Sequence, residues 1–97
     1  MTNPEDVNPR NFTVKSIIYN DGDFSIAWGE WEDGEMHLAM RWNGDSNDDA
    51  GYPKTFGHPV WFLIPENLTI DITRSLVGNK AANAAAVEKI LDDNSSN

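Results

Sequence analysis

Three segments in the first half of the chain alternate apolar and polar residues in the manner of β-strands. They span residues 11–19, 24–31 and 36–42, and they are rich in β-branched and aromatic side chains. Asp21-Gly22 and Asp33-Gly34 separate them, and glycine supplies the positive φ that a tight hairpin needs. The pattern therefore predicts an antiparallel meander of three strands.

The alternation also assigns side chains to the two faces of this meander. One face of the first strand carries Phe12, Val14 and Ile18, and one face of the second carries Phe24, Ile26 and Trp28. In the third strand this face carries Met36, Leu38, Met40 and Trp42. We expect Trp28 and Trp42 to belong to the core. In the third strand His37, Ala39 and Arg41 should point away from it.

The second half of the chain predicts a fourth strand and one or two helices. Residues 59–65 form an apolar strand with prolines at both ends, and both of its faces need a cover, either the preceding loop or a second subunit. Residues 66–77 fit helix or strand, and we favour helix because Leu68, Ile72 and Leu76 recur every four residues. Asn79 should cap a further helix over residues 80–92. The expected fold is α+β, a four-stranded antiparallel sheet with C-terminal helices packed on it.

The domain organisation follows from the same pattern. Residues 1–10 are polar and contain two prolines, which predicts a loose N-terminal arm. Residues 11–92 should form a single α+β domain, and residues 93–97 should fray.

Composition restricts the classes of function. Seven Lys and Arg oppose sixteen Asp and Glu, and the formal charge of −9 disfavours direct binding to nucleic acid or anionic membranes. The charge serves either solubility or recognition of a basic partner by imitation of nucleic acid. Cysteine is absent, no signal peptide is visible, and no apolar run approaches the ~20 residues of a membrane span. We therefore expect a cytoplasmic protein.

The loop over residues 43–59 is the candidate functional region, because loops of this length in compact domains are usually functional or disordered. Its acidic half places Asp45, Asn47 and Asp49 at alternate positions, as at the start of a calcium loop. Ala50 and Phe56 then stand where the EF-hand needs Gly and Glu. A solvated, Asx-rich turn is the expectation, with a weak cation site as the alternative.

Motifs for catalysis are missing. The two histidines, His37 and His58, are too few for a zinc site without carboxylate help. No serine lies in a nucleophile elbow, and the glycines lie in turns instead of forming a phosphate loop. We expect a protein that is not an enzyme and needs no cofactor or metal.

Aromatic residues around the loop are the candidate binding residues. The full set of candidates is Trp31, Arg41, Tyr52, Phe56, His58 and Trp61. Such aromatics either form a contact surface or fold back and pin the loop onto the sheet. Arg41, similarly, either joins the surface or pairs with an acidic neighbour such as Asp45.

The motifs Arg41-Trp42-Asn43-Gly44, Gly51-Tyr52-Pro53 and Trp61-Phe62, followed by Pro65, carry a resemblance over about residues 28–77. This stretch resembles short uncharacterised bacterial proteins of the mobile-gene or integron-cassette kind. The resemblance implies a mobile accessory gene and supplies no catalytic residue.

The leading hypothesis is a small, acidic, non-catalytic binding or accessory protein that meets a protein partner through the 43–59 loop and its aromatics. One alternative is an acidic inhibitor that mimics nucleic acid. Another is a small-molecule or sugar-binding module on the Trp and Tyr side chains. A homodimer through exposed sheet aromatics is also an expectation.

Overall fold

The computed structural model of the chain describes residues 2–45 and 49–95, and it contains one main sheet, one hairpin and a helical layer. In chain order the elements are η1 (Pro4–Asp6), β1 (Phe12–Asn20), β2 (Phe24–Trp31), β3 (Met36–Trp42), β4 (Lys54–Thr55), β5 (His58–Pro59), β6 (Phe62–Leu63), η2 (Glu66–Leu68), α1 (Thr69–Ser75) and α2 (Ala84–Ser95). The sheet is antiparallel in the order β1-β2-β3-β6. The predicted α+β fold, with four strands and two C-terminal helices, is confirmed.

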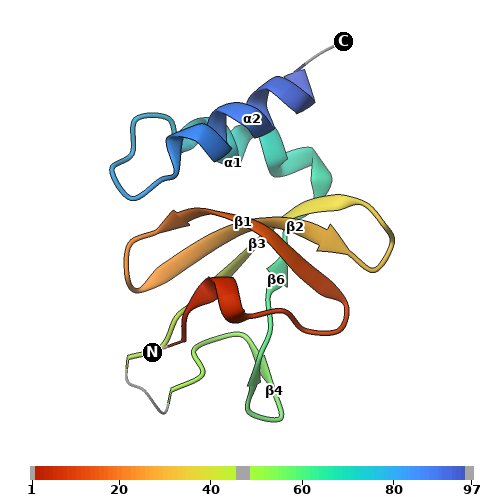
Figure 1. Cartoon of the computed structure of the whole chain (residues 1–97), viewed down its shortest axis with the longest axis vertical. Helices are drawn as coiled ribbons and strands as arrows, with labels where there is room; N and C mark the ends of the chain where they lie inside the picture. The colour runs from red at the N-terminus through yellow and green to blue at the C-terminus, as the bar shows by residue number, and fades with distance from the viewer. Residues whose placement is uncertain (1, 46–48, 96–97) are drawn as a thin grey trace.

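The sheet lies between two different covers. Figure 1 shows α1 and α2 on one side of the strands, and the N-terminal segment and the green chain after β3 on the other. The helix side holds an apolar cluster of Ile18, Ile26, Leu38, Ile64, Leu76, Val87 and Ile90. The opposite side holds Val7, Phe12, Ala27, Ala39 and Trp61. Both sides of the sheet are therefore buried over part of their area.

The faces predicted for β2 and β3 are confirmed, whereas those of β1 are not. Between β2 and β3 the register runs without interruption from Phe24 opposite Trp42 to Glu30 opposite Met36. In β1 the register shifts twice, between Val14 and Ser16 and between Ile17 and Tyr19. Each shift inserts one residue and moves the following side chains to the other face. Phe12 and Ile18 consequently lie in opposite clusters, although simple alternation placed them together.

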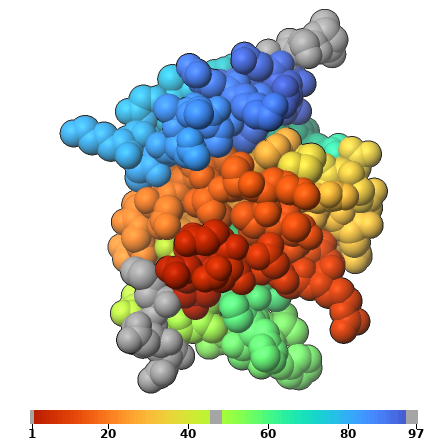
Figure 2. Space-filling model, viewed as in Figure 1, coloured from red at the N-terminus to blue at the C-terminus, as the bar shows by residue number. Residues whose placement is uncertain are grey.

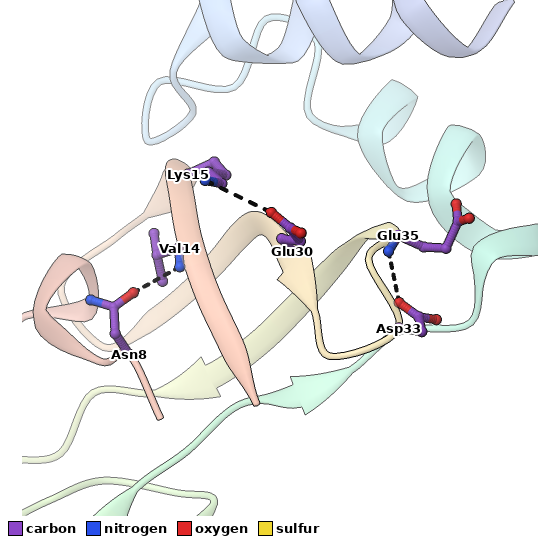
Figure 3. A network of polar contacts seen from close by, with 6 residues as sticks. All are labelled: Asn8, Val14, Lys15, Glu30, Asp33 and Glu35. Carbon is purple, nitrogen blue, oxygen red and sulfur yellow. Dashed lines mark hydrogen bonds and ion pairs between the residues drawn. The ribbon is translucent and has the colours of Figure 1, made fainter. Parts of the chain in front are cut away.

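The N-terminal segment packs against the domain, so the prediction of a loose arm was wrong. Pro4 and Val7 are buried, and the Trp61 indole N–H donates to the carbonyl oxygen of Val7 at 2.7 Å. The Asn8 side chain accepts a hydrogen bond from the N–H of Val14 at 2.8 Å (Figure 3). Figure 2 shows this red segment lying directly on the strands. It supplies the cover that we had expected from the loop or a second subunit.

The helical layer confirms helix over residues 66–77 and corrects the start of α2. The Asn83 side-chain oxygen accepts a hydrogen bond from the N–H of Ala86 at 3.2 Å, as a helix cap does. Asn79, the predicted cap, instead accepts from the N–H of Ala81 within the preceding turn. The helix therefore covers residues 84–95 in place of 80–92. None of the helices in the described ranges is long and apolar enough to cross a membrane.

The predicted fourth strand is shorter than expected. Only Phe62 and Leu63 pair with β3, opposite Met40 and Ala39. Proline at residue 59 has no N–H for a ladder, and the N–H of Val60 donates to the carbonyl of Pro53 instead. The residues before β6 thus leave the sheet and join the loop.

Figure 3 shows two further polar contacts, one in the β2–β3 turn and one between β1 and β2. The Asp33 side chain accepts a hydrogen bond from the N–H of Glu35 at 2.8 Å in the β2–β3 turn. Lys15 and Glu30 approach to 3.9 Å across β1 and β2. Since both side chains are about half exposed, this ion pair adds little to stability.

Candidate functional site

Arg41 is the buried anchor of the 43–59 loop. The residue is 1% exposed, although it was expected to point away from the core. Its Nη1 donates to the carbonyl oxygens of Val60 at 2.5 Å and Pro53 at 3.3 Å. Its Nη2 donates to the carbonyl oxygen of Ala50. The guanidinium therefore joins three separate points of the loop, and the predicted pairing with Asp45 was wrong.

The environment of Arg41 explains why the loop holds its shape. Burial lowers the pKa of Arg41, but an arginine keeps its charge in a protein. A buried charge is tolerated only when hydrogen bonds replace its water. The three carbonyl oxygens do so for Nη1 and Nη2, whereas Nε has no hydrogen-bond partner among the described residues. The guanidinium carbon also lies 6.0 Å from the centre of the Trp61 ring, within reach of a cation–π contact. Removal of this side chain would leave several loop carbonyls without partners.

The first part of the loop, residues 43–53, is closed by its own backbone. The N–H of Trp42 donates to the carbonyl of Tyr52 at 2.6 Å, and the N–H of Tyr52 donates back at 3.0 Å. The Asp49 carboxylate accepts from the N–H groups of Asp45 at 3.0 Å and Gly51 at 2.9 Å. These backbone donors lower the pKa of Asp49. The expected Asx-rich turn is therefore built on Asp49.

Asn43 joins this part of the loop to the β1–β2 turn. Its buried side chain donates to the carbonyl of Gly22 at 3.1 Å and accepts from the Ser25 hydroxyl at 2.8 Å. Its backbone N–H donates to the carbonyl of Asp23 at 2.7 Å. The two chain segments consequently form one rigid end of the sheet.

Exposed aromatic side chains gather at this end, on the face of the sheet that the helices cover farther along. Trp42 is 56% exposed, Tyr52 66% and Phe62 61%. They border a shallow depression of about 230 Å³, the aromatic groove, lined by Phe24, Met40, Arg41, Trp42, Tyr52, Pro53 and Phe62. The Phe24 ring meets the Trp42 ring edge to face at 4.7 Å and so orients it.

The second part of the loop, residues 54–59, is a small hairpin that projects from the molecule (Figure 1). Phe56 and Gly57 form its turn with φ values of +51° and +81°. Such a turn favours Asn-Gly, because an aromatic side chain in the left-handed region is strained. Phe56 is nevertheless 97% exposed. It does not fold back onto the sheet, so the alternative in which Phe56 pins the loop was wrong.

The six predicted binding residues fall into two groups. Trp61 is buried between Phe12 and Arg41, and Arg41 is itself buried. Trp31 lies at the other end of β2 from Phe24, roughly 20 Å from the groove at the usual rise per strand residue. These three serve the fold. Tyr52, Phe56 and His58 are exposed on the loop, and among them only Tyr52 lines the groove.

Sequence reasoning missed Trp42 and Phe62 as surface residues. Trp42 was expected in the core, but it lies on the last position of β3, where the helices no longer cover the sheet. Phe62 carried a usable signal. It directly follows Trp61, so a strand that buries Trp61 on one face must turn Phe62 to the other.

The weak cation site remains without support. Within residues 2–45 and 49–95, no cluster of three His, Asp or Glu side chains could hold a metal ion. Asn47 lies outside the described residues. The Asp49 carboxylate is already engaged with two backbone N–H groups.

The chain was compared with models of protein families, with curated proteins and with solved structures, and none of these comparisons gives a match. The function therefore has to be argued from the geometry of the groove and the loop.

Proposed function

We propose that this protein is a non-catalytic binding protein whose contact surface is the aromatic groove. One observation carries the proposal: Trp42, Tyr52 and Phe62, each more than half exposed, border a single apolar depression. Scattered exposed apolar residues are normal, whereas adjoining large aromatics mark a contact surface. Tryptophan and tyrosine are also the residues that most often dominate binding energy.

The rigid support of the groove favours binding as well. Tyr52 is held by its backbone pairing with Trp42, and the Arg41 guanidinium binds the carbonyl of the adjoining Pro53. A surface that is already ordered loses less conformational entropy when a partner binds. The buried charge of Arg41 thus helps to position an apolar surface that is open to solvent.

The size of the groove distinguishes between a macromolecule and a small ligand. Pockets for small molecules usually enclose roughly 300–1,000 Å³ and bury most of the ligand. The groove is smaller, at about 230 Å³, and its aromatic rims are open to solvent. A protein partner is therefore preferred over the small-molecule or sugar alternative. A cytoplasmic, accessory role, as the resemblance to mobile-gene-cassette proteins implies, stays a prediction.

Retention of partners from a lysate of the source cells tests the proposal with paired variants. Trp42→Ala and Phe62→Ala should each release the partner proteins that the wild-type protein retains. Val77→Ala, which truncates an exposed apolar residue outside the groove, should retain them. Circular dichroism checks that every variant is folded. If folded Trp42→Ala and Phe62→Ala retain the same proteins as the wild type, the groove is not the contact surface.

A further inference from the structure

An acidic hollow adjoins the aromatic groove on the other side of Trp42. It measures about 380 Å³ and is lined by Asp23, Trp42, Gly44, Asp45, Asp49 and Gly51. Trp42 lines both depressions, so an occupant of the groove reaches the hollow across one indole ring. Three carboxylates therefore stand beside the proposed contact surface.

The hollow is held in place by hydrogen bonds between its walls. Asn43 fixes the backbone of Asp23 on one wall through a 2.7 Å bond to its carbonyl. Asp49 accepts the N–H of Asp45 on the other wall at 3.0 Å. An aspartate is ordinarily charged at neutral pH, and the N–H donors that lower the pKa of Asp49 favour the charged form further. The carboxylate of Asp49 and the backbone positions of Asp23 and Asp45 are thus defined beside Trp42.

Positive charge from Lys54 and the N-terminal amine acts on Asp49 but offsets only part of the negative charge at this site. Among the described residues that line the groove or the hollow, Arg41 is the one cation, and its Nη1 and Nη2 groups donate to backbone carbonyls. Lys54 lies near enough to affect the pKa of Asp49 but does not line the hollow. With a net charge of −9, the whole chain adds to the negative potential there.

We propose that the aromatic groove and the hollow together bind a partner segment in which apolar side chains alternate with lysine or arginine. This inference rests on the proposed function of the groove and specifies its partner. Apolar side chains of the segment lie on Trp42, Tyr52 and Phe62. A basic side chain crosses the Trp42 ring, where a cation gains from the π face, and reaches the carboxylates of Asp23 and Asp45.

Other occupants fit the site less well. Nucleic acid and a second copy of this chain both carry a negative charge that the hollow repels. A divalent cation would need a tighter set of oxygen ligands than the described carboxylates provide. A basic and apolar segment satisfies both the charge and the aromatic surface.

Three matched peptides test the partner chemistry by fluorescence anisotropy with the full chain. The first is a labelled, end-capped Gly-Leu-Lys-Phe-Lys-Leu-Gly, and the other two carry Gln or Glu in place of both lysines. We expect the lysine peptide to bind about tenfold or more tightly than the glutamine peptide, and the glutamate peptide more weakly still. Raising the salt from about 50 mM to about 500 mM should weaken the lysine peptide most.

Variants then assign the charge effect to the hollow. The Asp23→Asn, Asp45→Asn double variant should lower the affinity for the lysine peptide to about that of the glutamine peptide. Asp71→Asn, an exposed acid of α1 away from the site, should leave it unchanged. Trp42→Ala should weaken all three peptides. Circular dichroism and urea unfolding confirm that each variant is folded.

The outcomes separate this inference from the proposed function. Equal binding of the lysine and glutamine peptides, or an unchanged affinity in the folded double variant, overturns the basic partner. If Trp42→Ala still abolishes binding in that case, the groove remains the contact surface. Absence of binding by the lysine peptide at about 1 mM also overturns the inference, because a charged pair and an apolar anchor should exceed that affinity. The function of the groove is then decided by the lysate experiment alone.

Discussion

The two parts of the 43–59 loop each contain glycine, proline and one aromatic residue, but they have opposite relations to the rest of the molecule. Residues 43–45 and 49–53 are tied to the sheet and its β1–β2 turn by Arg41 and Asn43, and Asp49 binds two N–H groups within them. Residues 54–59 form a hairpin that pairs with itself and extends Phe56 into solvent. Glycine, proline and aromatic content therefore does not decide whether the described residues of a loop part are bonded to the sheet. The decisive feature is whether a buried side chain binds the loop backbone.

The largest expected effect comes from removal of the anchor. Arg41→Leu should lower the free energy of unfolding by about 2–4 kcal/mol, because buried carbonyl oxygens lose their donors. Arg74→Leu, at an exposed arginine of α1, is the matched control and should change it by less than about 0.5 kcal/mol. Urea unfolding measures both. Similar effects from the two substitutions would mean that Arg41 does not hold the loop.

Two glycines, one in each part of the loop, test the difference between the two parts at the backbone. Gly51 in the tied part and Gly57 in the hairpin have φ values of +76° and +81°. An added Cβ at Gly51 would overlap the Trp42 carbonyl and the Arg41 side chain, whereas at Gly57 it would meet nothing within 4 Å. Gly57→Ala should cost about 1 kcal/mol from its φ alone. Gly51→Ala should lower the free energy of unfolding clearly more than Gly57→Ala does. Equal losses of stability in thermal unfolding would contradict the close packing of Gly51 against Trp42 and Arg41.

Acid should loosen the tied part through Asp49. The pKa of Asp49 is lowered in the folded protein by the N–H groups of Asp45 and Gly51, relative to the usual value near 3.9 in an unfolded chain. The unfolded state therefore takes up this proton first, and the stabilisation by Asp49 is complete above that value and is lost as the pH falls through the folded pKa. Carboxyl NMR titration should show the lowered pKa. The stability difference between the wild type and Asp49→Asn should shrink over the same pH range, and a constant difference would argue against the two hydrogen bonds.

The hairpin should give the smallest effect on stability. Phe56→Asn places a residue that tolerates the left-handed region at the turn, and it removes no buried contact. We expect the free energy of unfolding to stay unchanged or to rise by less than about 1 kcal/mol. A clear loss of stability in calorimetry would show that Phe56 packs against the domain after all.

The regular parts of the fold could be predicted because local patterns carry them. The two Asp-Gly turns, the alternation in β2 and β3 and the alanine-rich α2 each depend on neighbours in sequence. The two bulges of β1 could not be predicted, since one inserted residue leaves the apolar content of the strand unchanged. The length of the segment between the third and fourth predicted strands was enough to indicate the loop.

The place of the candidate site was predicted, but only two of the residues that line the groove, Arg41 and Tyr52, were among the predicted candidates. The alternation along the third strand predicts that Arg41 points away from the core. Its burial is favourable only because the carbonyls of Ala50, Pro53 and Val60 lie within reach of its side chain. Trp42 reads as core because tryptophan usually is. Its exposure depends on where the helices end above the sheet, which no local pattern records.

The hydrogen bond between Trp61 and Val7 has a consequence for the order in which the protein is made. It joins residues 54 positions apart, and Val7 belongs to the part of the chain that is synthesised first. At roughly 5–20 residues per second, Val7 waits about 3–10 s before its partner exists. During that interval Val7 can pack only on Phe12, Ala27 and Ala39, and the N-terminal segment gains this hydrogen bond after Trp61 has been added.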